Sequence, residues 1–233
     1  MASSKVLVAL SEALDVSLDY LFREFEVGLE RIRFRKMSTL PKKHLFDIPD
    51  GVIYLDGNSL GVMPKGAGAR ALQVIEAEWG QELIRAWNTA GWMALPQKVG
   101  DRIARLIGAP AGSVATGDTL SIKVYQALAA SLKMRPDRKV VLSDNGNFPT
   151  DLYMAQGLIH TLDRDYQMVL KDPQNIESSL NEDVAVLMLT QVDYRTGRMH
   201  DMKALTKKAQ DLGIITIWDL AHSAGAVPVD LED

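Results

Sequence analysis

The sequence has no cysteine, no basic excess and no long apolar run. Without cysteine in its 233 residues, the chain can form no disulfide framework, no thiolate metal site and no cysteine nucleophile. Its formal net charge of −4 at pH 7 argues against binding to nucleic acid or to an anionic membrane surface, because such proteins normally carry a basic excess. No apolar segment approaches the roughly 20 residues that cross a bilayer. We therefore expect a cytoplasmic protein.

Short apolar runs alternate with segments of helical spacing over most of the chain. The runs typical of parallel strands are 139–143, 167–170, 184–189 and 214–218. The main segments with apolar residues at helical spacing are 122–132, 152–162 and 202–212. This alternation predicts an α/β fold with a doubly wound, mostly parallel sheet. We expect 184–189 to be its central strand, because that run is the most apolar, and 214–218 to be buried.

The segments before residue 139 are less regular. We predict a strand over Val52–Leu55, helices over Pro64–Trp79 and Val99–Ile107, and a lid or substrate-side loop over Glu82–Trp92. Apolar residues recur at helical spacing in the two helices, whereas Glu82–Trp92 is rich in Trp and polar in places.

Residues 1–45 are predicted to form a helical N-terminal arm, separate from a domain over 46–233. The segment SEALDVSLDYLF (11–22) resembles the closing helices of a bacterial helix-turn-helix regulator, and six basic residues follow it between Arg31 and Lys43. One interpretation is a DNA-binding piece. We favour a plain helical arm, because acidic residues nearly cancel the basic ones here and a recognition helix would lie upstream of this segment.

Two chemistry-bearing residues follow the run 214–218. Asp219 comes directly at the carboxyl end of this predicted strand, and His222 lies three residues further on. Ligands of open α/β sheets bind beyond the carboxyl ends of the strands. A carboxylate there can pair with a protonated heterocyclic nitrogen, as pyridoxal phosphate (PLP) requires. On these residues alone, an Asp that caps a loop and a His without a ligand remain the simpler interpretation.

A second candidate lies at the start of the helix predicted around 122–132. Gly117, Thr119 and Ser121 lead into this helix, whose first turn offers free backbone N–H groups, hydroxyl donors and the positive end of the helix dipole. These groups suit a phosphate dianion. An ordinary N-cap is the alternative, since Ser and Thr cap many helices.

Three motifs carry a resemblance to a known family. They are YLDGNSLG (54–61), NFPTD (147–151) and WDLAHSAGA (218–226). In this order they closely resemble kynureninase, a PLP-dependent enzyme of the aspartate-aminotransferase (type I) fold. The WDxAH part is shared with cysteine desulfurases and other class V aminotransferases, whereas YLDGNSLG and NFPTD are more specific. The resemblance covers the chain from about Phe46 to Asp233.

The resemblance implies a set of cofactor contacts. Asp219 would keep the pyridine nitrogen of PLP protonated, and His222 would have a positioning role near its O3′ and phosphate side. Phe148 would lie flat against the pyridine ring, and Pro149 would hold the turn. The other positions that match cofactor-binding residues are Leu120 (through its backbone), Ser121, Thr150, Asp151 and Thr190.

The resemblance also implies an activity. Such an enzyme cleaves L-kynurenine or 3-hydroxykynurenine with water, giving anthranilate or 3-hydroxyanthranilate and L-alanine in tryptophan catabolism and NAD biosynthesis, and it works as a homodimer. In that family the Schiff-base lysine and the arginine for the substrate carboxylate lie beyond the position of Asp233. We therefore expect this chain to lack the covalent anchor and to be inactive alone.

Some charged residues match no family motif. Lys203, Lys207 and Lys208 are expected to be solvated on a helix surface. Asp193 and Arg195 stand where the family more often shows Asn and Lys, and we expect them to be solvated loop charges.

Two other functions stay open. One is a cysteine desulfurase-like class V enzyme, which would share the Asp219–His222 pair; YLDGNSLG and NFPTD argue against it. The other is a non-catalytic DNA-binding regulator, built from the N-terminal arm and a PLP-type fold.

Overall fold

The computed structural model of the chain describes residues 43–57 and 59–232. The helices predicted for the N-terminal arm and nearly all of its basic segment lie outside these residues. The arm and its boundary near residue 45 therefore stay predictions. Within the described ranges, no helix is both long enough and apolar enough to span a lipid bilayer.

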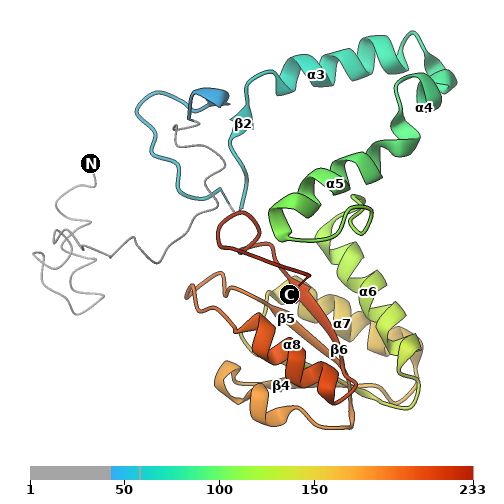
Figure 1. Cartoon of the computed structure of the whole chain (residues 1–233), viewed down its shortest axis with the longest axis vertical. Coiled ribbons are helices and arrows are strands. Elements are labelled where there is room, and N and C mark those ends of the chain that lie inside the picture. The colour runs from blue at the N-terminus through green and yellow to red at the C-terminus, as the bar shows by residue number, and fades with distance from the viewer. Residues whose placement is uncertain (1–42, 58, 233) are drawn as a thin grey trace, which may run out of the picture. The chain divides into compact units, whose positions relative to one another are not determined.

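The larger sheet of the described part has four strands and lies in the lower half of the view in Figure 1. Its strands are β3 (Val140–Asp144), β4 (Gln167–Lys171), β5 (Val184–Thr190) and β6 (Ile215–Asp219), in the spatial order β4-β3-β5-β6. Every neighbouring pair is parallel. The predicted α/β fold and its parallel sheet are confirmed. All residues of β5 are buried, as expected for a central strand.

Helices cover both faces of this sheet. On one face, α6 (Leu120–Met134) and α7 (Pro149–Leu162) pack against strand residues that include Val186 and Met188. On the other face, α8 (Met202–Asp211) packs against the alternate residues Leu187 and Leu189. The short turns η6 (Pro173–Asn175) and η7 (Glu177–Ser179) precede β5. Each buried Leu or Met side chain contributes about 1.5–3 kcal/mol, so burial on both faces fixes which residues of β5 point each way.

Short elements make up the chain before the sheet. They are η2 (Lys43–Leu45), β1 (Phe46–Asp47), β2 (Met63–Pro64), α3 (Ala67–Gln73), η3 (Val74–Trp79), η4 (Leu83–Arg85), α4 (Ala86–Thr89), η5 (Trp92–Ala94) and α5 (Leu95–Ile107). The two helices predicted here are confirmed, with α3 continuing into the π-helix η3. The loop predicted over Glu82–Trp92 is instead mostly short helical turns, and its Trp87 and Trp92 rings meet edge to face at 5.9 Å.

The strand predicted over Val52–Leu55 is wrong. No strand includes these residues, and the side chains of Ile53 and Leu55 are 86% and 90% exposed. An apolar run forms a strand only where a neighbouring strand makes hydrogen bonds with its backbone N–H and C=O groups. The antiparallel partner that lies nearby, β2, pairs with β1 instead.

β6 differs from the fully buried strand that its composition predicts. It lies at the edge of the sheet, and only Asp219 in it is buried, while the other four residues are partly exposed. Both faces of β6 are still covered, since Ile217 packs with the α6 and α7 cluster and Trp218 with the α8 cluster. The strand is apolar because both of its faces are covered. It is partly exposed because no further strand pairs with its outer side in the described sheet.

The direction of α6 places its first turn at the carboxyl edge of the sheet. Just beyond its other end, Arg138 Nη1 donates to the carbonyl oxygens of Val184 and Leu212, near the starts of β5 and β6, at 3.0 and 2.9 Å. A helix of 15 residues at about 1.5 Å per residue spans about 22 Å, which is close to the roughly 23 Å of the seven-residue β5 and more than the roughly 16 Å of the five-residue β6. The start of α6 therefore reaches the edge at which β5 and β6 end. α7 begins at the same edge, directly after β3.

Gly100 in α5 gives a test of this packing. A Cβ built at Gly100 would overlap the backbone carbonyl of Val114, whereas a Cβ at Gly157 in α7 would meet nothing within 4 Å. We expect Gly100→Ala to lower the free energy of unfolding by ~1–3 kcal/mol or more, because the added methyl group overpacks this contact. Gly157→Ala should raise it by about 0.5–1 kcal/mol, because Ala favours a helix. Urea unfolding of both variants measures this; a neutral Gly100→Ala would contradict the close approach.

Candidate active site

The ends of β5 and β6 bring Thr190 and Asp219 together. The two residues are register partners in the parallel pair, and Thr190 Oγ1 lies 3.2 Å from Asp219 Oδ2. The backbone N–H of Ala221 donates to Asp219 Oδ1 at 2.7 Å. Both oxygens of this buried carboxyl group are therefore oriented by the strand ends.

Asn147 links the end of β3 to this pair. Its Nδ2 donates to Ser143 Oγ at 2.9 Å and to a carbonyl of β5 at 3.3 Å. These bonds turn its Oδ1 toward the backbone N–H of Phe148, at 2.7 Å, and toward the hydroxyl of Thr190. Because that hydroxyl has one proton, it donates to either Asn147 or Asp219. Sequence analysis did not single out Asn147, since a buried Asn before a helix is also an ordinary capping residue.

Asp151 is a second buried carboxyl group. It lies in the first turn of α7, and its Oδ1 has no hydrogen-bond partner among the described residues. Burial, and then the charge of Asp219, raises the pKa of Asp151 from 3.8 to about 7. The start of a helix normally stabilises a carboxylate, but here burial outweighs that effect. The two acids therefore create a place where a bound cation would be stabilised.

Three rings follow the same three strands. The Phe148 and Tyr194 rings meet edge to face with centroids 5.1 Å apart, and the Tyr194 and His222 rings are stacked at 6.1 Å. Phe148 and His222 are 6.0 Å apart. We call these three side chains the ring cluster. His222 Nδ1 is buried and has no hydrogen-bond partner among the described residues.

The start of α6 offers groups for an anion at the same edge of the sheet. Leu120 and Ser121 are its first two residues, and the N-cap residue Thr119 makes no side-chain capping bond. First-turn N–H groups of a helix attract anions, as the sequence predicted here. Lys123, which was not among the predicted site residues, also lies in this first turn. Its ammonium would be 2.8 Å from a Cβ built at Gly117, and it pairs with Asp118 at 3.4 Å.

The structure places every residue predicted for the site. The residues that it brings together at the strand ends are Phe148, Asp151, Thr190, Asp219 and His222. Pro149 is the first residue of α7, where its missing N–H is tolerated, so it opens a helix as well as ending the turn. Thr150 follows it and is exposed. The roles of all these residues toward a cofactor stay predictions. In residues 43–57 and 59–232, no group of three or more His, Asp and Glu side chains could hold a metal ion.

Asp193 is buried, so the prediction of a solvated charge is wrong for this residue. Its carboxylate accepts the backbone N–H groups of Arg195 and Thr196 at 2.8 and 3.0 Å. Burial alone would raise its pKa, but these two bonds and the charge of Arg195 lower it overall. Arg195 itself is exposed, as expected. The turn that Asp193 holds presents Tyr194, which no motif or periodicity in the sequence could indicate.

The charged face of α8 agrees with its prediction. Lys207 pairs with Asp211 at 3.0 Å and Lys208 with Glu177 at 3.1 Å, and both lysine side chains are exposed. Lys203 lines a cavity with Lys207.

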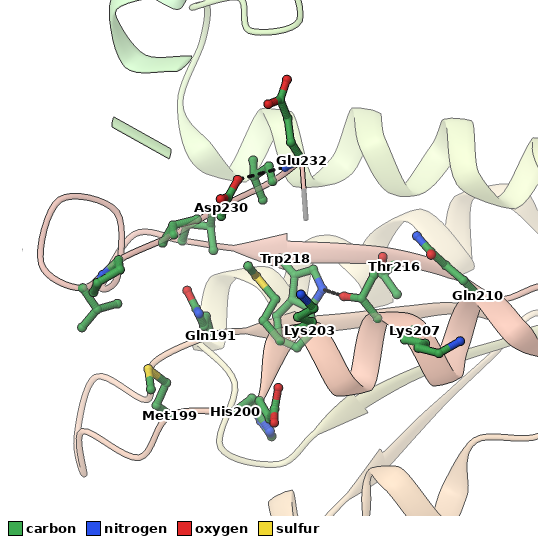
Figure 2. A pocket seen from close by; sticks show the side chains of 18 of the residues that line it. Gln191, Met199, His200, Lys203, Lys207, Gln210, Thr216, Trp218, Asp230 and Glu232 are labelled. Atoms are coloured by element: carbon green, nitrogen blue, oxygen red, sulfur yellow. Dashed lines mark hydrogen bonds between the residues drawn. The ribbon is translucent and has the colours of Figure 1, made fainter. Parts of the chain in front are cut away.

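That cavity does not contain the candidate active site. It has a volume of about 1140 Å³ and lies beside α8, with Thr216 and Trp218 of β6 in its wall (Figure 2). Successive residues of a strand point to opposite faces, so Asp219 points away from Trp218. We assign the chemistry to the strand ends, because the acids and rings converge there.

A known family matches the part of the chain that forms this edge of the sheet. The sequence model of the family described as aminotransferase class-V matches residues 91–233, which contain the start of α6, the ring cluster and both buried acids. The chain belongs to the class-V aminotransferase family. This membership agrees with the parallel sheet and with the position of Asp219 at a strand end.

Curated relatives of this class-V chain include kynureninases. A kynureninase from Burkholderia pseudomallei (strain 1106a) is 56% identical over 196 residues, which are 82% of this chain and 47% of the relative. A kynureninase from Pseudomonas fluorescens is 51% identical over 199 residues, 83% of this chain and 48% of the relative. The chain thus spans about half the length of these relatives. The resemblance predicted from the three motifs is confirmed.

Solved structures share the fold of the class-V chain at low identity. A C-DES mutant with glycine covalently linked to its PLP cofactor superposes with a TM-score of 0.62 at 15% identity, over 83% of this chain and 53% of that one. A NifS-like protein gives 0.63 at 11% identity, over 78% and 52%. The cysteine desulfurase CsdA from Escherichia coli gives 0.59 at 15% identity, over 81% and 50%. At such identities these matches confirm the fold alone.

The raised pKa of Asp151 predicts a pH dependence of stability. Between its unfolded value near 3.8 and its folded value of about 7, the folded state binds more protons than the unfolded state, so stability falls as pH rises through this window. Asp151→Asn has no proton to lose. We therefore expect it to stabilise the chain more at pH 7.5 than at pH 4.5, measured as the difference in free energy of unfolding in urea. An equal difference at both pH values would contradict the raised pKa.

Proposed function

We propose that the chain supplies the PLP-binding part of a kynureninase. The proposed enzyme hydrolyses L-kynurenine or 3-hydroxykynurenine to anthranilate or 3-hydroxyanthranilate and L-alanine. The observation that carries the proposal is the 56% identity to the Burkholderia kynureninase over 82% of this chain. A cytoplasmic location and a homodimer are part of the same proposal.

The described residues fit PLP on structural grounds. Asp151 Oδ1 and His222 Nδ1 are buried polar atoms that find no hydrogen-bond partner within the described part of the chain, and a planar polar ligand at this edge would satisfy them. Asp219 lies beside them as an oriented, buried carboxyl group. A pyridinium N–H is a cation and a hydrogen-bond donor, so it complements two neighbouring acids.

Each group at this edge has a proposed role. Asp219 accepts the hydrogen bond of the pyridine N–H and holds the proton on that nitrogen. Phe148 covers one face of the ring, and His222 orients it through Nδ1. The first turn of α6, with Ser121, and the charge of Lys123 hold the phosphate. When bound, PLP supplies an electron sink for the negative charge that develops at the substrate Cα.

The two alternatives have less support. Two cysteine desulfurases among the solved structures are 15% and 19% identical, against 51–56% for the kynureninases, so their likeness concerns the fold. The DNA-binding alternative depends on residues 1–42, which lie outside the described part of the chain.

Activity tests this proposal directly. We would append to this chain the segment that the Burkholderia relative carries beyond the matched region, add PLP and follow anthranilate fluorescence with L-kynurenine. We expect turnover, and we expect Asp219→Ala to reduce it at least about 1,000-fold, since a few kcal/mol of charge stabilisation is lost. Asp211→Ala, which removes an exposed acid of α8, should leave it unchanged. A folded, PLP-loaded chimera that releases sulfur from cysteine and no anthranilate would contradict the proposal.

A further inference from the structure

Asp144, the last residue of β3, is a buried acid outside the candidate active site. Its Oδ2 accepts hydrogen bonds from His200 Nε2 at 2.7 Å and Arg198 Nη2 at 3.3 Å. Its Oδ1 accepts the backbone N–H of Gly146 at 2.8 Å. Burial alone would raise the pKa of Asp144, but these partners, His200 first, lower it overall. A buried carboxylate bound from three sides fixes the groups around it, because leaving any of them unpaired is unfavourable.

Two of these partners belong to the loop between β5 and α8, which we call the 192–200 loop. Its arms are joined by an antiparallel bridge between Val192 and Met199. The N–H of Asp193 donates to the carbonyl of Arg198, and the N–H of His200 donates to the carbonyl of the residue after β5, both at 2.9 Å. Together with the turn held by the Asp193 carboxylate, these bonds make the loop a small hairpin. The hairpin is tied to β3 through Asp144.

The loop also makes a close approach to the turn between β3 and α7 (145–148). A Cβ built at Gly146 would lie 3.0 Å from Asp193 Oδ2 and 3.3 Å from Arg195 Nη2. The same Cβ would lie 3.3 Å from Asp144 Oδ1, so Gly146 leaves room for the side chains of both the acid and the loop. The same turn continues into Asn147 and Phe148, which contact the strand ends of the candidate active site.

We propose that Asp144 is a positioning residue: by anchoring the 192–200 loop against the turn 145–148, it places the Tyr194 ring against Phe148 and His222. Asp144 touches none of the three rings. It acts through Arg198 and His200, which belong to the second arm of the hairpin, after the turn that carries Tyr194. The Tyr194 ring is exposed on the edge where a planar ligand would lie, so its position affects ligand affinity. This last step rests on the proposed function, whereas the anchoring does not.

Two substitutions of similar chemistry separate anchoring from general stability. Asp144→Asn keeps the side-chain size but replaces one acceptor oxygen with an NH₂ donor. In one orientation the NH₂ faces the N–H of Gly146, and in the other it faces the donors of Arg198 and His200, so a hydrogen bond is lost either way. Asp172→Asn is the matched control. Asp172 also binds the turn, since its Oδ1 accepts Asn145 Nδ2 at 2.6 Å, but it has no bond to the 192–200 loop.

The first measurement is the ¹⁹F spectrum of the chain labelled with 3-fluorotyrosine, with the Tyr194 signal assigned by Tyr194→Phe. We expect Asp144→Asn to move this signal toward that of free 3-fluorotyrosine, and Asp172→Asn to leave it in place. An unmoved Tyr194 signal in folded Asp144→Asn would overturn the proposal. If Asp144→Asn does not fold, Arg198→Gln, which keeps the carboxylate but removes its ion pair with the loop, must move the signal in the same direction; no shift there overturns the proposal equally.

The second measurement is PLP affinity, followed by quenching of Trp fluorescence. We expect Asp144→Asn to weaken binding about tenfold in the presence of Tyr194 and to have little effect in the Tyr194→Ala background, because it acts through that ring. An equal loss in both backgrounds would overturn the proposal. A chain that shows the ¹⁹F shift but no PLP binding would support the anchoring and count against the proposed function.

Discussion

The parallel register of β5 and β6 determines where the chemistry of this chain can lie. It pairs Thr190 with Asp219, and because every strand of the sheet runs the same way, the segments after β3, β5 and β6 leave at one edge. Asp151 and Asp219 are buried there, and burial, followed by the charge of Asp219, raises the pKa of Asp151 to about 7. The sheet tolerates this because both of its faces are covered by helices with apolar clusters. The candidate active site thus lies at the edge of a well-packed scaffold.

Polar contacts behind the ring cluster hold it in place. Asn147 orients the backbone of Phe148, and Asp144 ties down the loop that carries Tyr194. Asn147 and Asp144 are proposed to act on a ligand only through the rings that they position. They lie at or just after the end of β3, whose position is fixed by burial. Class-V membership agrees with the position of this edge at the strand ends, and the described residues explain how it keeps its shape.

Sequence alone predicts the features that depend on local pattern. Alternating apolar runs give the parallel sheet and the central place of β5, and short motifs give the family and the acid at the end of β6. Features that depend on distant partners are missed. Val52–Leu55 has the composition of a strand but no strand to pair with, and β6 has a buried composition at an exposed edge. Asp193 is missed for another reason: its partners are the N–H groups of its own turn, and the composition of a charged loop does not show that the turn folds around the carboxylate.

The central claim is that Asp219 recognises a protonated ring nitrogen. The most direct test compares the binding of PLP and of its 1-deaza analogue, in which carbon replaces the ring nitrogen, to the chain and to Asp219→Asn. We expect the chain to bind PLP at least about tenfold more tightly than the analogue, a difference of ~1.4 kcal/mol, and Asp219→Asn to lose this preference. Equal affinity of the unsubstituted chain for both ligands would contradict it.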